Sequence, residues 1–197
     1  MVKVFKAIMT GWFFTGLFAW GLFLIPGVEF LEQILGGLIT DLDTFLLGMQ
    51  GFGVPLYLAE SVLELFLFNV YPLSWTLLYR PDDAVTIALM IVPWIASGFV
   101  TTLIAKPDNP KEMIKVGIVL IISNSIWCVG LFMLAPLALN AIPMGGGIIS
   151  GVLNGISSGF TDMPAGVSAI LTNLEGGGLF IGMGVFTAIL MEGRGEK

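Results

Sequence analysis

Long apolar runs alternate with short polar breaks along this chain of 197 residues. Four runs have the apolar character of a helix that crosses a bilayer, which needs about 20 residues. They are residues 7–26, 84–105, 113–136 and 177–191, and the last needs neighbouring residues to reach that length. The pattern predicts an all-α, polytopic integral membrane protein with four spanning helices.

Residues 28–49 show a different pattern. Apolar residues recur every three or four positions, as on one face of a helix, while acidic and polar residues fall mostly on the opposite face. A spanning orientation would place Asp41 and Asp43 in hydrocarbon, at a cost of roughly 2.5–3.5 kcal/mol each. We therefore expect an amphipathic helix that lies along the outer surface of the membrane.

Two further apolar segments are predicted to dip into the membrane from the outer side and return. In the first, residues 54–80, Pro72 provides the bend. In the second, residues 144–175, a hairpin turns at 161–164 and its second arm is broken by the glycines at 176–178. The alternative is that residues 28–79 and 144–175 each form a pair of spans, which gives six to eight spans in total.

The basic residues set the expected orientation. Seven of the eight lie at the two chain ends or in the loop after residue 105, and in a four-span chain these places share one side. The positive-inside rule puts that side, with both termini, in the cytoplasm. The layout suggests a single transmembrane domain, 1–197, with halves 1–105 and 113–192 joined by the cytoplasmic loop 106–112.

Glycines form the clearest motif. They recur every fourth residue in 144–160 and again near the C-terminus, and such small-xxx-small faces let membrane helices pack closely. The predicted helix-packing residues are Gly147, Gly151, Gly155, Gly159, Gly178 and Gly182. This face predicts contact with another helix of the chain or with another subunit.

Composition and charge exclude several classes of function. Histidine is absent and the only cysteine is Cys128, so the chain has no ligand set for haem, iron–sulfur or cysteine-rich metal sites and no internal disulfide. The net charge is −6 without a basic patch, which argues against nucleic-acid binding. The glycine triplets lack the lysine and serine or threonine of a phosphate-binding loop. Without histidine, and without a catalytic motif, we expect no enzyme activity, cofactor or bound metal.

Carboxylates in apolar surroundings are the second functional signal. Glu60 and Glu64 lie one helical turn apart, and two like charges at that spacing would raise the pKa of at least one carboxyl group. Buried inside a bundle they could bind a proton or a monovalent cation, with Asp162 at the predicted hairpin tip. The competing interpretation is that both glutamates face water at the interface and that Asp162 caps a helix.

Tryptophan and tyrosine residues mostly lie near the ends of the predicted spans, where aromatic side chains anchor a protein at the interface. Trp94 is one of them.

Two functions remain. The first is a non-catalytic subunit of a homo- or hetero-oligomeric membrane complex, which packs through its glycine-striped helix against copies of itself or other membrane subunits. The second is a small cation or proton channel or transporter that uses the outer-side carboxylates. No Asn-x-Ser/Thr sequon occurs, which fits a multi-pass protein of a prokaryotic cell membrane, with membrane lipid as its surroundings.

Overall fold

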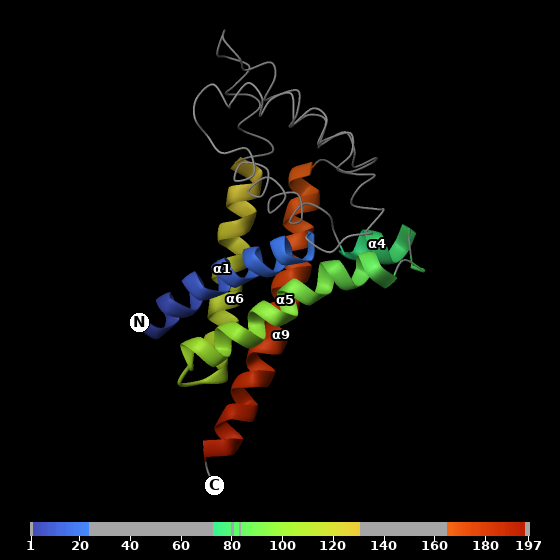
Figure 1. Ribbon diagram of the computed structural model, residues 1–197. Helices are drawn as coiled ribbons and strands as arrows, with labels where there is room; N and C mark the ends of the chain where they lie inside the picture. The colour runs from blue at the N-terminus through green and yellow to red at the C-terminus, as the bar shows by residue number, and fades with distance from the viewer. Residues whose placement is uncertain (1, 24–72, 80, 83, 131–164, 196–197) are drawn as a thin grey trace, which may run out of the picture.

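The computed structural model describes residues 2–23, 73–79, 81–82, 84–130 and 165–195. Its helices are α1 (Val2–Phe23), α4 (Leu73–Tyr79), α5 (Ala84–Ala105), α6 (Pro110–Val129) and α9 (Ala165–Gly195) (Figure 1). These ranges contain no strand, so the all-α prediction is confirmed for them. The outer amphipathic helix predicted at 28–49 and most of both dipping segments lie outside the described residues.

The turn between α5 and α6 is determined by local backbone and side-chain interactions. α5 ends where Lys106 takes a left-handed conformation with φ 49°, and the Lys106 N–H donates to the carbonyl of Thr102 at 3.0 Å. Asn109 caps α6, because its side-chain oxygen accepts a hydrogen bond from the Lys111 N–H at 2.8 Å. The reversal therefore brings the start of α6 beside the end of α5.

α1 and α5 form an antiparallel pair. Near one end of the pair, the Lys6 ammonium donates to the carbonyl of Ile104 at 3.2 Å. Further along, the Ser97 hydroxyl donates to the carbonyl of Gly11 at 3.1 Å. As the contacting residue number rises on α1 it falls on α5, which fixes the antiparallel sense.

α6 and α9 form a second antiparallel pair with a regular register. Gly117 faces Ile181, and Ile121 faces Gly177, which is one turn later on α6 and one turn earlier on α9. The α1–α5 pair crosses this α6–α9 pair (Figure 1). Each predicted half of the chain thus supplies one antiparallel pair, while the division into halves itself stays a prediction.

Where the two pairs cross, α5 and α9 run in the same direction. Trp94 lies against Gly176, Gly98 against Phe180, and Thr102 against Gly184. Each of these contacts joins residues 82 apart in the sequence. The steps of four residues show that matching turns of the two helices meet one after another.

The core lies at this crossing and draws on all four long helices. Its most buried apolar residues are Ala7, Trp94, Ala105, Met113, Val116, Leu120 and Phe180. Phe180 has no exposed surface and is the largest fully buried side chain among those described. Trp94 is only 2% exposed, so its predicted role as an interfacial anchor is wrong. The indole is buried because Gly176 leaves space for it on α9.

The predicted break at the glycines 176–178 is also wrong. α9 is one continuous helix of 31 residues that includes all three glycines. Residues 165–175 form its first turns and are not a separate arm. Glycine disfavours a helix by about 1 kcal/mol relative to alanine. Here, however, Gly176 and Gly177 admit the side chains of Trp94 and Ile121, and this packing supports the helix.

One described helix is long and apolar enough to cross a membrane, the 28-residue stretch Gly166–Gly193. A second apolar helical stretch, Met90–Ala105, is shorter. Helices do occur at all four positions where spans are predicted. The apolar stretch of α6 is shortened by charged residues in its first turns and by Ser123, Asn124 and Ser125. Residues 131–136 of its predicted span lie outside the described ranges.

Candidate functional site

Most of the predicted site residues lie outside the described ranges. These are Gly147, Gly151, Gly155 and Gly159 of the glycine stripe, and Glu60, Glu64 and Asp162 of the predicted cation or proton site. Their roles stay predictions. The two that can be placed, Gly178 and Gly182, both belong to α9.

One face of α9 carries glycines that are packed inside the molecule. A Cβ atom at Gly176 would overlap the indole of Trp94, and one at Gly177 would overlap the side chain of Ile121. At Gly184 a Cβ would lie 2.8 Å from Cε of Met113. These glycines let α5 and α6 approach the α9 backbone. Sequence reasoning attributed the first two to a helix break and did not select Gly184.

The closest backbone approach occurs at Gly98 of α5. A Cβ atom there would lie 2.5 Å from the carbonyl oxygen of Phe180. Because the opposing atom belongs to the backbone of α9, no side-chain rotation could relieve that contact. Gly98 was not among the predicted packing residues, since it stands alone in its run without a second glycine four residues away.

Gly178 and Gly182 lie on the opposite, exposed face of α9. Nothing among the described residues lies within 4 Å of a Cβ atom built at either position. Leu174 and Phe186, one turn before and one turn after, are 51% and 56% exposed. The pair therefore does not pack against the described helices of its own chain, and it forms a shallow step between two exposed apolar side chains.

Buried hydroxyl groups tie the helices together at the crossing. The Thr15 and Ser97 hydroxyls lie 2.8 Å apart and join α1 to α5. The Thr102 hydroxyl donates to the carbonyl of Gly98 at 2.8 Å and lies 3.3 Å from that of Gly184, which joins α5 to α9. Hydroxyls that bond to carbonyls within apolar helices are typical of membrane bundles. Serine and threonine residues inside the predicted apolar runs are the sequence pattern that could have indicated these contacts between helices.

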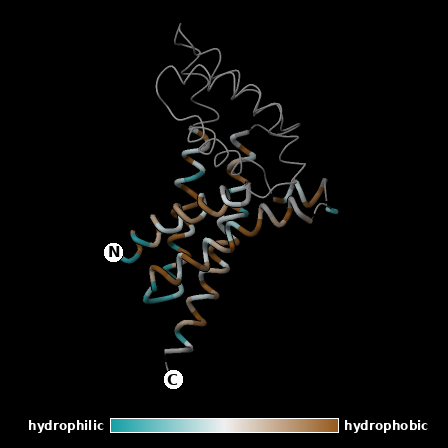
Figure 2. The backbone as a smooth tube through the Cα atoms, in the orientation of Figure 1, coloured by the Kyte–Doolittle hydropathy of each residue, from teal (hydrophilic) through white to brown (hydrophobic). Residues whose placement is uncertain are grey.

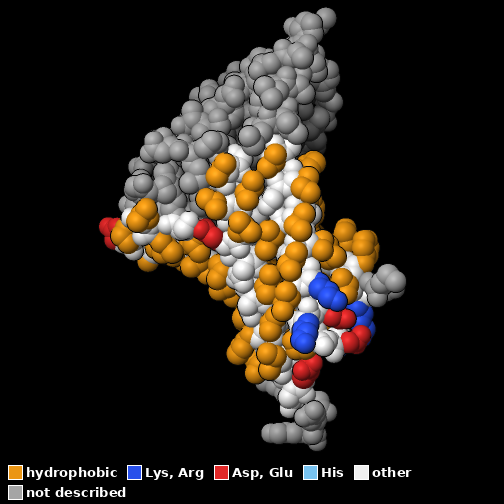
Figure 3. Space-filling view, turned by 180° about the vertical axis from the view of Figure 1, so that it is seen from behind, with side chains coloured by type: hydrophobic (Ala, Val, Ile, Leu, Met, Phe, Trp, Pro, Cys, Tyr) orange, Lys and Arg blue, Asp and Glu red, His pale blue; other side chains and the backbone are white. Residues whose placement is uncertain are grey.

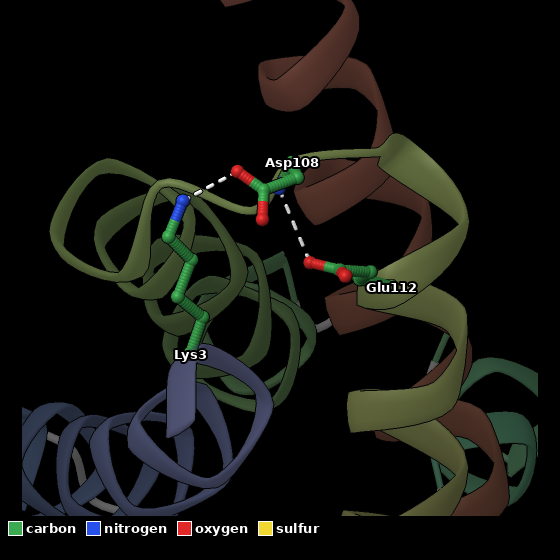
Figure 4. A network of polar contacts seen from close by, with 3 residues as sticks. All are labelled: Lys3, Asp108 and Glu112. Atoms are coloured by element: carbon green, nitrogen blue, oxygen red, sulfur yellow. Dashed lines mark hydrogen bonds and ion pairs between the residues drawn. The ribbon is translucent and has the colours of Figure 1, made fainter. Parts of the chain in front are cut away.

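The start of α1 and the α5–α6 turn are hydrophilic (Figure 2), and the lysines lie together with acidic side chains at this end (Figure 3). Lys3 forms an ion pair with Asp108, whose backbone N–H donates to the Glu112 carboxylate at 3.2 Å (Figure 4). The pair is exposed, so it contributes about 0–1 kcal/mol to stability. Its main effect is to hold the N-terminus beside the loop that starts α6.

At the other end, Glu175 of α9 reaches the start of α4. Both of its carboxylate oxygens accept from the Ser74 N–H, at 3.0 and 3.1 Å. A carboxylate at the first turn of a helix satisfies a backbone donor that has no partner within that helix. Sequence reasoning did not select Glu175, because its partner lies 101 residues away.

A cavity of about 10 Å³ lies between α4, α5 and α9, which is room for about one water. Its lining residues are Leu73, Met90, Trp94, Thr172, Gly176 and Leu179. Within the described ranges, no group of three acidic or cysteine side chains is close enough to hold a metal ion.

Comparisons of this chain with protein-family models, curated proteins and solved structures give no match, and no family is assigned to it.

Proposed function

We propose that the chain is a non-catalytic integral membrane subunit that packs within a homo- or hetero-oligomeric complex. The observation that carries this proposal is the apolar surface of the helix bundle. Twenty-two large hydrophobic side chains are exposed among the described residues, on α1, α4, α5, α6 and α9. They include Phe13 at 60%, Ile126 at 68% and Phe186 at 56%. A soluble monomer rarely exposes so continuous an apolar surface.

The distribution of charge supports the same proposal. The lysines gather at one end of the face seen in Figure 3, and hydrophobic side chains cover much of its described part. The Lys3–Asp108 ion pair holds the N-terminus at the end where α5 turns into α6. In the proposed four-span arrangement this end, with both chain termini, lies in the cytoplasm.

The length of α9 is compatible with this orientation. Its stretch Gly166–Gly193, 28 residues long, extends about 42 Å at 1.5 Å per residue, more than the roughly 30 Å of bilayer hydrocarbon. A longer helix accommodates by tilting.

Labelling from the two sides of the membrane tests the orientation. In a Cys128→Ser background, we expect Asp82→Cys to react with a membrane-impermeant thiol reagent in intact spheroplasts, because Asp82 is exposed in the turn between α4 and α5. We expect Lys111→Cys to react only after the cells are opened. Labelling of both positions from the same side would contradict the proposed orientation.

Assembly is expected to depend on the exposed glycine pair of α9. Changing Gly178 and Gly182 together to leucine fills the shallow step between Leu174 and Phe186. We expect the complex in mild detergent to dissociate at least tenfold more readily, as measured by mass photometry, since small residues permit close helix approach. Melting of the single subunit should change little.

Gly193→Leu is the matched control, since Gly193 is also exposed on α9 with nothing described within 4 Å of a Cβ. Its complex should keep the parent's size. A Gly151→Leu, Gly155→Leu pair examines the predicted stripe in the same way. An unchanged complex in both double variants would contradict assembly through glycine faces.

A further inference from the structure

We propose that the outer face of α6 binds an anionic phospholipid, with the headgroup phosphate at Lys111 and Lys115 and an acyl chain along Ile118, Ile122 and Ile126. This inference rests on the proposed membrane location. It adds a specific lipid contact to it, on a face of the bundle that the glycine-mediated contacts do not use.

The two lysines carry positive charge without a partner in the part of the chain that the structure describes. Lys111 and Lys115 are exposed and lie one helical turn apart. The nearby ammonium groups differ, since Lys3 pairs with Asp108 and Lys6 donates to a backbone carbonyl. Lys111 and Lys115 make no ion pair with any described carboxylate. They can therefore face one phosphate together.

An apolar track continues from these lysines along the same face of the helix. Ile118 is 46% exposed, Ile122 53% and Ile126 68%, at steps of four residues. From Lys115 to Ile126 the helix rises about 16 Å at 1.5 Å per residue. That is close to half of the roughly 30 Å hydrocarbon thickness, the depth of one leaflet. A lipid whose headgroup meets the lysines would lay its chain along the isoleucines.

Charge favours a lipid over a second copy of the chain at this face. Copies inserted in the same direction and packed through the same α6 stripe would bring their Lys111 and Lys115 pairs toward each other. Like charges at such a contact repel each other. An anionic headgroup has the opposite charge, and long lysine side chains reach readily from an apolar helix to the interface.

The test is lipid binding to the full-length protein in mild detergent, followed by native mass spectrometry. The parent is titrated with phosphatidylglycerol and with phosphatidylcholine of the same acyl chains. We expect tighter binding of phosphatidylglycerol. Lys111→Gln with Lys115→Gln should lower that affinity about 30-fold, at about fivefold for each lysine, and leave phosphatidylcholine binding unchanged.

The control removes the same charge from the same end of the molecule. Lys3→Gln with Lys6→Gln should lower phosphatidylglycerol affinity less than about threefold, because those amines are already engaged. An equal loss in both variants would overturn the proposal and indicate a general charge effect. Equal affinity of the parent for the two lipids would also overturn it.

Further measurements distinguish a different occupant of this face from a failure of the proposed membrane location. If soluble glycerol phosphate displaced the lipid at equal concentration, the lysines would form a free phosphate site and the lipid proposal would fail. If the Lys111→Gln, Lys115→Gln variant lost its oligomeric state, the face would belong to a second copy and the proposal would again fail. Recovery of the parent outside the membrane fraction would instead refute the membrane location.

Discussion

Replacing Gly98 with alanine is expected to destabilise the helix bundle strongly, because the added methyl group would meet the backbone of α9 rather than a side chain. The new Cβ would lie 2.5 Å from the Phe180 carbonyl oxygen and 3.2 Å from two further backbone atoms of that residue. α5 and α9 would have to separate, and the contacts of Trp94 and Thr102 one turn away on either side would weaken with them. The cost should reach or exceed the upper end of the roughly 1–3 kcal/mol usual for overpacking.

The measurement is thermal unfolding of purified protein in one detergent. A loss of about 3 kcal/mol corresponds to a melting temperature lower by on the order of 6–12 °C for a chain of this size. Gly178→Ala is the control, because the same methyl group meets nothing described within 4 Å there and alanine favours the helix. It should keep or raise the parent's melting temperature. A Gly98→Ala protein as stable as the parent would contradict the close backbone approach.

Alanine at Gly11 or at Gly184 should destabilise the bundle less than alanine at Gly98, and this expected order is informative. At Gly11 and Gly184 the nearest atoms belong to the flexible side chains of Leu120 and Met113. Those side chains can move by rotation, whereas the backbone opposite Gly98 cannot. The size of each effect therefore depends on the rigidity of the opposing atom as well as on the distance to it.

The positions of the helices were largely predictable because apolar run length is a local property. All four predicted spans coincide with described helices, at least in part. The α5–α6 turn could also be located, since the lysine loop between two apolar runs contains two prolines and an asparagine. Such signals need no knowledge of which helix packs against which.

The contacts between helices were not predictable in the same way. Gly176–Gly178 suggested a break because isolated helices disfavour glycine, yet Trp94 and Ile121 fill the space that two of them leave. Sequence alone could not supply the register of 82 residues between α5 and α9 that brings Trp94 to Gly176. For the same reason Trp94 resembled an anchor near the end of a span. Packing across the bundle decided both outcomes.

Truncating Phe180 to alanine should produce the second large effect, and it offers a direct test of coupling across the core. The ring is fully buried beside α1 and lies within reach of a Cβ at Gly11, at 3.1 and 3.3 Å. Removing a buried phenylalanine side chain costs about 3–5 kcal/mol, from lost burial and from the cavity that remains. The expected result is a melting temperature lower by on the order of 10 °C, measured in the same detergent.

Gly11→Ala tests whether that cavity is where the structure places it. In the parent, the added methyl group must displace Leu120 and the Phe180 ring, so it should be destabilising. In the Phe180→Ala background one of those obstacles is gone and the methyl group partly fills the space. The two substitutions should therefore be non-additive by about 0.5–3 kcal/mol, with the double variant more stable than the sum predicts. Simple additivity would mean that α1 and α9 do not meet at Phe180.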